Sequence, residues 1–537
     1  MYLREVKRRN KEGAEVVYYQ LAESVYDKAR RQARVRVVHT FGRADEVDAE
    51  ALRRLSSSLL KACGPAPDPP VETERTYDLG LVHVVGTLWE NLGVGPALRR
   101  QMAEWKRHKH PFDRILMALT AYRLDDPVSK RGCYEYWLPE RVWMPESSAW
   151  KLEEFYRAMD FYRENADALE EELLRNHCTH FGSEVDLVFL DLSLLKIVTG
   201  EVPTGAASFA SPHQNVRSAA VKFWAGIAVS RIGVPIQTWV FPETTPQETA
   251  LACMEADLRR SGLVRLVCIG EAAEVPGKPG PRSHIRAVPM WGAREVKESV
   301  LARPGRYRPM SDSLEVKEVL VNSGGHRRRY ILCRNPEEAQ RRTQWRAWVL
   351  KLLEAELQAL DPADTGYAGK VKELRGSQLF GGYLRENRAK RLLPDAVKIS
   401  REARMDGKCV LTTNDDTLTA EEVALSDQAA RVAEEFFRQA RTMGLRSRPM
   451  FHWSPHRIEA HVRLCAIFIV VQRYAELRTG ASWERLRRQL EPCKAIRLRM
   501  GDRVRIRQTL SGPELQATFA RLGVPAEAPL ALPPPGP

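Results

Sequence analysis

The sequence has no hydrophobic run long enough to cross a membrane. Its longest apolar stretch, residues 464–471, lies between Arg463 and Gln472, whereas a membrane-spanning helix needs about 20 apolar residues. The first residues, MYLREVKRRNKEG, contain no apolar segment of the kind found in a secretory signal. Both absences argue against a membrane protein and against a secreted one, and we expect a cytoplasmic location.

Closely spaced cysteines are also absent. The chain has nine cysteines among 537 residues, and no two of them form a C-x-x-C pair. Zinc modules and disulfide frameworks depend on such spacing. The pattern therefore argues against both kinds of small domain and is typical of a reducing cytosol.

Acidic residues are fewer than basic residues. Lys and Arg number 83 against 69 Asp and Glu, which leaves a net charge of +14. Because a cationic surface speeds the encounter with phosphate backbones, a polyanionic partner is the first interpretation to consider. Apolar residues make up 44% of the chain, so it can bury a sizeable core, and its length suits about three or four domains.

Half of the charge excess falls in one segment, residues 485–507. This segment holds nine cations and two acids, a difference of +7. The cations are Arg485, Arg487, Arg488, Lys494, Arg497, Arg499, Arg503, Arg505 and Arg507. A solvated charged surface is the ordinary interpretation of such a segment, but at this density we favour contact with phosphates.

The first third of the chain divides by its periodicity. Residues 1–63 hold two strand-like stretches, 16–21 and 35–40, which predict a β-hairpin. A proline-bearing linker follows them. Residues 76–180 then show the helical periodicity that predicts a small all-α domain.

From residue 184 onward the pattern predicts a mixed α/β core, whose first part is 184–291. Thr245 and Glu248 have the spacing of a capping box at the start of a helix in this part. The expected elements, in chain order, are strands at 185–190, 219–230 and 234–241, a helix at 245–261 and a strand at 263–269. This order predicts three strands in a meander, a crossover helix and a strand that returns parallel.

A β-rich insertion is expected at residues 292–407. Strand pairs are predicted around the turn at 322–325, followed by a charged helix at 337–360. The apolar side of that helix is expected to consist of Trp345, Trp348, Leu352 and Leu353.

The second part of the core is expected at residues 408–480. It would contain a strand at 409–413 and a helix at 420–442, for which Thr419 and Glu422 have capping-box spacing. A basic C-terminal segment, 481–524, and a disordered proline-rich tail, 525–537, complete the chain.

Three carboxylates in this core are candidates for chemistry. Asp191 ends a buried strand in V-F-L-D-L-S, Glu271 follows the parallel strand in V-C-I-G-E, and Glu434 lies within the helix at 420–442. Each has an ordinary structural interpretation, as a turn cap, a loop residue and a surface helix residue respectively. Two adjacent strands and a helix packed on them could nevertheless bring all three together.

Such a cluster of carboxylates would need cations. Like charges repel and raise one another's pKa values unless a divalent ion neutralises them. Oxygen ligands suit Mg²⁺ or Mn²⁺, and two ions per site could activate a water or a 3′-hydroxyl and stabilise a leaving oxygen.

The order of short motifs resembles that of the insertion-sequence DDE transposases. The motifs are F-L-D-L-S at Asp191, G-V-P-I-Q-T-W-V-F-P at 233–242, R-P-G-R-Y at 303–307, L-E-V-K-E-V at 314–319, C-R-N-P-E-E-A at 333–339, D-G-K-C-V-L-T-T-N at 406–414, E-x-x-F-R at 434–438 and R-P-M-F-H-W-x-x-x-R-I-x-A-H at 448–461. In that family a ribonuclease-H-like mixed sheet with flanking helices is interrupted by a β-rich insertion. The resemblance therefore implies this α/β fold, here preceded by the β-hairpin and by an all-α domain that would bind DNA.

The resemblance also implies the roles of the carboxylates. Asp191 and Glu434 would be the first and third catalytic and metal-binding residues. Glu271 would stand where the family has its second Asp, directly after the small residue Gly270. The tyrosine, arginine, glutamate and lysine of the family's YREM-type helix signature fall on Asp427, Ala430, Glu434 and Arg441.

The resemblance implies contacts with DNA as well. The expected phosphate-binding residues are Arg431, Arg438, Arg441, Arg485, Arg487, Arg488, Lys494, Arg497 and Arg499. The partner would be double-stranded DNA, both the terminal repeats of the element and the target, and the pairing of two ends implies a dimer in the DNA complex. The protein would then work at a bacterial or archaeal nucleoid.

The function implied is a DNA transposase that hydrolyses the phosphodiester at each element end and transfers the freed 3′-hydroxyl to target DNA. An alternative is a decayed transposase that binds DNA as a repressor or architectural protein, which Glu271, Asp427 and Ala430 favour. A third is a nuclease on the same fold that cuts branched DNA.

Overall fold

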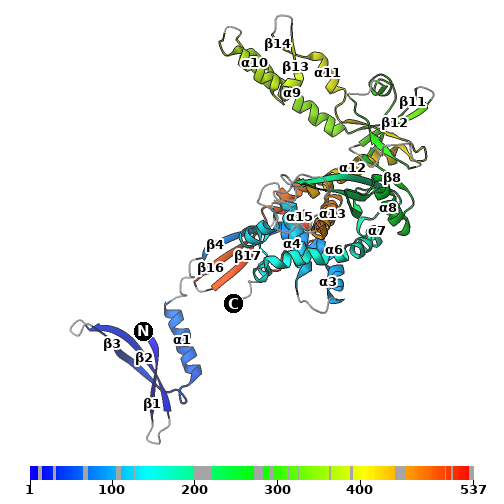
Figure 1. The fold of residues 1–537 in the computed structure, drawn as a ribbon. Coiled ribbons are helices and arrows are strands. Elements are labelled where there is room, and N and C mark those ends of the chain that lie inside the picture. The colour runs from blue at the N-terminus through cyan, green and yellow to red at the C-terminus, as the bar shows by residue number, and fades with distance from the viewer. Residues whose placement is uncertain are drawn as a thin grey trace. The chain divides into compact units, whose positions relative to one another are not determined.

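Two compact units make up the computed structural model, residues 1–72 with 499–503 and residues 73–498 with 504–537. Figure 1 traces the chain. The described residues are 1–9, 15–27, 32–63, 71–104, 110–125, 129–198, 220–270, 282–290, 295–311, 314–323, 326–361, 364–387, 391–441, 455–501, 503–509 and 512–530.

The first unit contains an antiparallel sheet and a helix. The elements are β1 (Tyr2–Arg9), β2 (Glu15–Asp27), β3 (Gln32–Arg43) and α1 (Ala49–Cys63). The predicted hairpin is confirmed, because β2 pairs with β3 with Gln20 opposite Thr40. The additional strand β1, which pairs with β2 with Val6 opposite Tyr18, went unpredicted because lysines and arginines interrupt its apolar alternation.

The second unit begins with one strand and a set of helices. Its elements are β4 (Val71–Asp78), α2 (Gly80–Asn91), α3 (Val94–Glu104), α4 (Phe112–Asp125), α5 (Lys130–Gly132), the π-helical η1 (Cys133–Arg141), the 3₁₀ turn η2 (Pro145–Ala149), α6 (Leu152–Arg175) and α7 (His177–Phe181). The helical character predicted for this stretch is confirmed.

A four-stranded mixed sheet follows, in the order β7-β6-β5-β8. Its elements are β5 (Val188–Val198), β6 (Ala220–Ser230), β7 (Pro235–Pro242), the helix α8 (Gln247–Arg260) and β8 (Leu266–Cys268). The pairs β5–β6 and β6–β7 are antiparallel, whereas β8 runs parallel to β5. The predicted meander, crossover helix and parallel strand are all confirmed.

The predicted capping box of α8 is wrong. The helix begins after Pro246, which makes no side-chain cap hydrogen bond. Glu248 instead pairs with Arg282, a residue that follows β8. Glu248 therefore forms an ion pair with a residue from a distant segment instead of capping its own helix.

A second sheet, in the order β10-β11-β12-β15-β9, combines three strands of the predicted insertion with β9 and β15, which were predicted to belong to the core. Its elements are β9 (Ile285–Ala287), the π-helical η5 (Val296–Val300), β10 (Arg308–Ser311), β11 (Leu314–Ser323), β12 (His326–Arg334) and β15 (Lys408–Thr413). The predicted turn near Asn322 is confirmed, since β11 pairs antiparallel with β12 up to Ser323 and His326. The strand β15, expected with the second part of the core, pairs with β12 and β9.

Helix α9 (Pro336–Gln358) leads into a small subdomain. The other elements are α10 (Tyr367–Gly376), η6 (Gly381–Tyr383), β13 (Leu384–Glu386), β14 (Leu392–Pro394) and α11 (Ala396–Ala403). Leu353 of α9 packs with Leu374, Leu384 and Leu392. The apolar side predicted for α9 is otherwise wrong, because Trp345, Trp348 and Leu352 are exposed.

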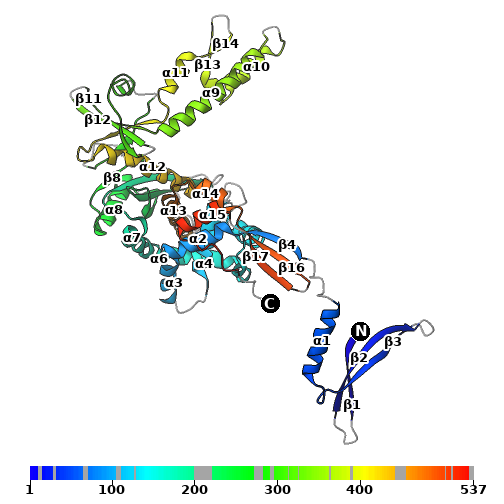
Figure 2. The same ribbon diagram turned by 180° about the vertical axis from the view of Figure 1, so that it is seen from behind.

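The chain then returns through two long helices to a C-terminal hairpin. The elements are α12 (Ala420–Arg441), α13 (Pro455–Thr479), α14 (Trp483–Leu490), β16 (Lys494–Met500), β17 (Arg503–Gln508) and α15 (Pro513–Leu522). The prediction of a disordered tail is wrong for residues 525–530, because the backbone N–H of Ala528 donates to Gln508 Oε1 at 2.8 Å and Leu530 packs against the main core. The capping box predicted for α12 is confirmed: the backbone N–H of Thr419 donates to Glu422 Oε2 at 2.9 Å, and that of Glu422 donates to Thr419 Oγ1 at 3.1 Å. Helix α12 packs against both β5 and β11 (Figure 2).

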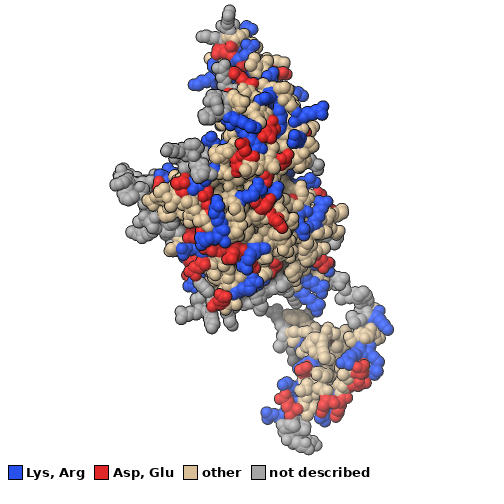
Figure 3. All heavy atoms as spheres, turned by 90° about the vertical axis from the view of Figure 1, so that its right-hand side faces the viewer, with Lys and Arg blue, Asp and Glu red and all other residues tan. Residues whose placement is uncertain are grey.

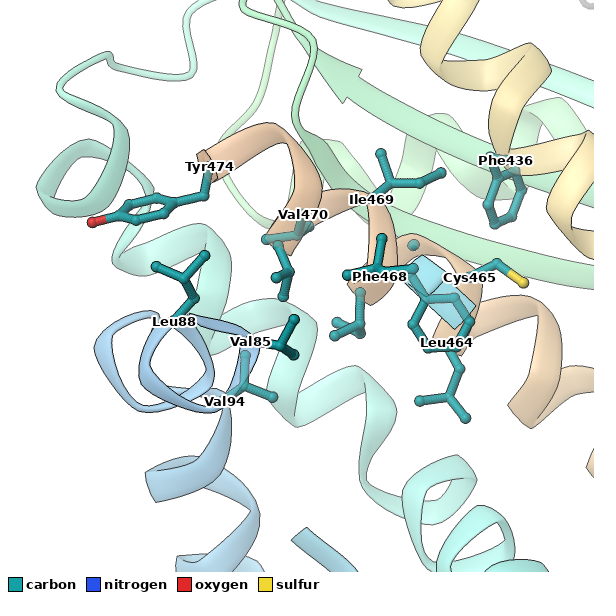
Figure 4. Close-up of a cluster of buried hydrophobic side chains, with 14 of the residues drawn as sticks. Val85, Leu88, Val94, Phe436, Leu464, Cys465, Phe468, Ile469, Val470 and Tyr474 are labelled. Atoms are coloured by element: carbon teal, nitrogen blue, oxygen red, sulfur yellow. The ribbon is translucent and has the colours of Figure 1, made fainter. Parts of the chain in front are cut away.

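Helix α13 is the centre of the main core. Its apolar run, residues 464–471, is buried on every side, with Val85 and Leu88 of α2 and Phe436 of α12 among the surrounding side chains (Figure 4). Within the described part of the chain, no helix has the length and apolar character needed to cross a membrane. The sequence's longest apolar run is therefore the inside of a globular core.

Candidate active site

The two faces of β5 carry different side chains. Because side chains alternate along a strand, Leu190 and Leu192 point to the face covered by α8, where they pack with Met254. Phe189 shares the other face and enters the main core with residues of α12. Asp191 therefore points to the α12 face.

Asp191 is a buried carboxylate on this face, with 6% of its surface exposed. Its Oδ1 accepts a hydrogen bond from the backbone N–H of Leu192 at 2.8 Å. A buried carboxylate is costly unless hydrogen bonds or cations compensate it. Because β5 continues to Val198, Asp191 lies inside a strand and not at its end as predicted, so it does not cap a turn.

The Cα atom of Gly270 lies close to the Asp191 carboxylate. The backbone N–H of Ile269 donates to Leu190 O at 2.8 Å, which holds the end of β8 beside β5. Gly270 follows with φ +57°, and a Cβ at this position would overlap both carboxylate oxygens of Asp191. Only glycine combines this backbone conformation with so close an approach, which gives a physical reason for the small residue before Glu271. Glu271 itself lies outside the described residues.

Helix α12 runs along β5 in the same direction. Near its start, Gln428 lies against Gly233 in the turn between β6 and β7. At its end, Arg441 Nη2 donates to Ser193 Oγ at 3.3 Å. These two contacts fix the helix at both ends of the strand segment that contains Asp191.

Glu434 is exposed between these two contacts. It precedes Arg441 by seven residues on the same helix, which is about two turns, so the two side chains lie on the same side of α12. Glu434 makes no hydrogen bond or ion pair with any residue that the structure describes.

The predicted arginines of α12 have different surroundings. Arg441 reaches the sheet through Ser193. Arg431 forms an exposed ion pair with Asp427 at 2.7 Å, and Arg438 pairs with Glu435. Exposed pairs one helical turn apart are worth only about 0.5 kcal/mol, so a phosphate could displace them.

A second polar contact on this face of the sheet was not predicted. Thr238 of β7 donates from its backbone N–H and its hydroxyl to Glu170 of α6, at 3.1 and 2.6 Å. Burial raises the pKa of Glu170 to about 7, while Arg463 of α13 and the hydrogen bonds from Thr238 act in the opposite direction. A glutamate inside a charged helix gives no sequence signal that it will be buried.

Among the described residues, no three His, Cys, Asp or Glu side chains are grouped to hold a metal ion. The cysteines with described side chains are free thiols, most of them buried. A metal site built on Asp191 thus depends on Glu434 and on the undescribed Glu271.

The comparison with known families gives one match. A family model described as the IS1634 family transposase, N-terminal domain, matches residues 3–70. The chain resembles insertion-sequence transposases. No curated protein matches the chain. The matched segment covers β1, β2, β3 and α1 and does not reach the carboxylates.

The basic C-terminal segment of this transposase-like chain is partly neutralised. Arg487 donates to the backbone carbonyl of Asp125 at 3.0 Å, and Arg488 pairs with Glu484. On β16, Lys494 pairs with Asp78 and Arg497 pairs with Glu74 at 2.7 Å. Four of the predicted DNA contacts thus already have partners within the chain.

Other cations of the same segment are exposed. Arg485 and Arg499, both predicted, are exposed, and Arg505 and Arg507 alternate with half-buried residues on β17. Arg505 and Arg507 have no ion-pair partner within the described residues. On the face drawn in Figure 3, basic and acidic side chains are interspersed, so a high local count of arginines in the sequence does not by itself define a basic surface.

Proposed function

We propose that the protein is a DDE-type DNA transposase with a ribonuclease-H-like catalytic core. The observation that carries the proposal is the buried Asp191 carboxylate, which lies against Gly270 on the sheet face covered by α12. Glu271 follows Gly270 in the chain, and Glu434 lies on α12, the helix that packs on β5. The strand order, with a three-stranded meander and a parallel β8, agrees with such a core.

The carboxylates fit two Mg²⁺ or Mn²⁺ ions. Asp191 is held on a rigid strand, Glu434 has no competing partner among the described residues, and carboxylate oxygens are the ligands that these hard cations prefer. Asp191, Glu271 and Glu434 would hold the ions. When bound, they would lower the pKa of an attacking water or 3′-hydroxyl and stabilise the leaving oxygen.

The chain's own residues orient the DNA strand. Arg441 contacts Ser193, which lies two residues beyond Asp191 on the same face of β5. Its guanidinium can bind a phosphate oxygen there once it releases Ser193. Arg431 and Arg438 can do the same after leaving Asp427 and Glu435. The burial of Asp191 excludes bulk water from its side of the site, which strengthens these electrostatic contacts.

The substrate would be double-stranded DNA at the element's terminal repeats and at the target. The exposed cations Arg485, Arg499, Arg505 and Arg507 suit phosphate contacts, which lose affinity steeply with added salt. Hydrolysis at each end followed by attack of the freed 3′-hydroxyl on target DNA requires two ends in one complex, and hence at least a dimer when DNA is bound.

A nicking assay tests the proposal. The full chain would be incubated with DNA that carries the element's ends, with Mg²⁺, with Mn²⁺ and with EDTA. We expect strand cleavage at the ends with either metal, no cleavage with EDTA, and no cleavage by the Asp191→Asn or Glu434→Gln variants. Cleavage that persists in both variants would rule out this site.

A second candidate is a transposase-derived protein that binds DNA without cutting it. The Asp427–Arg431 ion pair favours this second function. Asp427 occupies the tyrosine position of the helix signature, and its ion pair with Arg431 competes with binding of a phosphate by that arginine. Salt-sensitive DNA binding with no cleavage under either metal would establish this function. Cleavage of branched DNA without element ends would indicate a structure-selective nuclease instead.

A further inference from the structure

Helix α9 has two apolar faces, and only one of them is covered. On the covered face, Val349 and Leu353 are fully buried, and Leu353 packs with residues of α10, β13 and β14. On the other face, Trp345, Trp348 and Leu352 are 55%, 49% and 37% exposed. Large exposed apolar patches usually mark an interaction site.

The exposed face has a regular spacing. Trp345, Trp348, Leu352 and Ala355 are separated by three, four and three residues, and all four are exposed. This is the spacing of the a and d positions of a coiled coil, and we name these four residues the α9 seam. The rings of Trp345 and Trp348 already contact each other, with centroids 4.9 Å apart.

The charges on α9 argue against a nucleic acid as the partner. The helix carries four acids, Glu337, Glu338, Glu354 and Glu356, and four cations, Arg341, Arg342, Arg346 and Lys351. Its net charge is therefore zero in a chain of +14. Arg341 and Arg342 pair with Glu338, and Arg346 is buried in an ion pair with Asp406. A polyanion would find no surplus of positive charge beside the seam.

The charges that flank the seam are complementary to a second α9. With Trp345 and Leu352 at a positions, Lys351 occupies a g position and Glu356 the following e position. In a parallel two-stranded coiled coil, g of one helix lies beside the next e of the other. Both side chains are exposed and have no ion-pair partner within the described residues.

We propose that the α9 seam binds the same seam of a second copy of this chain, in parallel and in register. Each copy's Trp345 and Trp348 would lie against those of the other, and Lys351 of each would pair with Glu356 of the other. The helix is already folded and anchored on its covered face, so pairing costs no helix formation. Buried tryptophans are the residues that most often dominate interface energy. This association requires no DNA and does not depend on the proposed catalytic function.

The first test is the oligomeric state of the full chain without DNA. Sedimentation equilibrium over a range of concentrations should give a dimer, with the dissociation constant raised at least about tenfold in the double variant Trp345→Ala/Trp348→Ala. Val397→Ala is the matched control, since Val397 is 77% exposed on neighbouring α11 outside the seam, and it should dimerise like the wild type. A monomeric wild type, or a double variant that dimerises equally well, overturns the proposal.

The second test addresses the register. Leu352→Cys places a thiol at an a position, where it would face its counterpart in the second copy, so oxidised glutathione should convert the variant to a disulfide-linked dimer. Glu354→Cys, two residues along and away from the seam, should stay monomeric on a denaturing gel, as should the wild type. Equal cross-linking of both variants overturns the parallel seam.

Charge reversal provides an independent measurement. Lys351→Glu and Glu356→Lys should each weaken the dimer, whereas the double reversal should restore wild-type affinity because the pairing is preserved with opposite sign. Additive weakening in the double variant contradicts the Lys351–Glu356 pairing. Tryptophan variants that lose DNA affinity while dimerising normally would assign the seam to DNA and overturn the proposal.

Discussion

The two faces of the sheet β7-β6-β5-β8 bury different kinds of side chain. Towards α8, Leu190 and Leu192 pack with Met254, and Gly226 of β6 has no room for a Cβ because Met254 Sδ would lie 2.7 Å away. Towards α12 and α6, the same strands bury Asp191, Ser193 and Thr238. A buried leucine contributes about 1.5–3 kcal/mol of stability, whereas a buried carboxylate costs stability unless it is compensated. Both faces bury apolar side chains, the α12 face including Phe189 and Ile227 of the main core, but the groups proposed to act on DNA lie on the α12 face.

The largest effect is expected from removing the charge on the polar face. Asp191→Asn should reduce strand cleavage by about 10³-fold or more, because several kcal/mol of transition-state stabilisation depend on that carboxylate. The free energy of unfolding should fall little or rise, since a neutral amide is cheaper to bury than a carboxylate. Nicking rates and urea unfolding of the same preparation measure both effects. Cleavage within tenfold of the wild type would show that the polar face is not the active face.

A large-to-small substitution on the α8 face should lower the stability of the protein. Leu190→Ala should lower the free energy of unfolding by about 2–5 kcal/mol, because it leaves a cavity against α8. Leu194→Ala on the same strand is the control: Leu194 is 38% exposed and should cost much less. Chemical denaturation of the two variants measures the difference. An equal loss in both would mean that the burial of Leu190 against α8 does not stabilise the protein more than the half-exposed position of Leu194.

Glu170 should make the polar face sensitive to pH. Its pKa in the folded state, about 7, is above the value of 4.5 for an unperturbed glutamate, so folding favours the protonated form. That stabilisation is complete below about pH 4.5 and is lost as the pH rises through about 7.

The variant Glu170→Gln cannot ionise, so its stability relative to the wild type should increase between pH 5 and pH 8, by an amount on the order of 2 kcal/mol. Thermal unfolding across this range is the measurement. Glu171→Gln, exposed on the next position of α6, should follow the wild-type profile. If Glu170→Gln also follows it, Glu170 is ionised throughout, paired with Arg463.

The smallest effect is expected from the arginine beside Ser193. Arg441→Ala should lower cleavage about tenfold, equivalent to about 1.4 kcal/mol, the scale of one charge-assisted hydrogen bond to phosphate. Arg259→Ala, exposed on α8 at the other face of the sheet, should leave cleavage unchanged. Equal losses in the two variants would indicate a general charge effect and remove Arg441 from the site.

Sequence alone predicted those parts of the fold that depend on local pattern. The apolar runs before Asp191 and Gly270 and the Thr419–Glu422 box are each contained in a few consecutive residues, and each located an element of the fold. The pattern placed Asp191 next to a buried strand but ended that strand at Leu190, whereas β5 continues to Val198. The close approach of Gly270 to Asp191 could not be predicted, because it depends on how β8 lies against β5.

Ion pairs between residues far apart in the chain could not be predicted from the sequence. Thr245 and Glu248 have the spacing of a cap, but Glu248 pairs with Arg282 instead. Lys494 and Arg497 belong to a dense basic segment, yet their acidic partners precede them by more than 400 residues. No window of sequence contains both members of such a pair, so periodicity and local charge cannot detect it.

Helix α9 illustrates a different limit. Its low amphipathicity comes from apolar residues on two sides, and the pattern cannot say which side the rest of the chain will cover. The prediction took Trp345, Trp348, Leu352 and Leu353 as the apolar side, whereas of these the fold buries only Leu353, together with Val349.

The pairing of β4 with β16 determines when this protein can finish folding. The backbone N–H groups of Leu79 and Gly80, at the start of α2, both donate to Cys493 O at 3.0 Å, and β16 is the strand beside β4. A nascent chain that has emerged as far as α13 still lacks the strand that β4 needs. Until synthesis is almost complete, β4 therefore has no strand to pair with, and this sheet can form only after the C-terminal segment has been made.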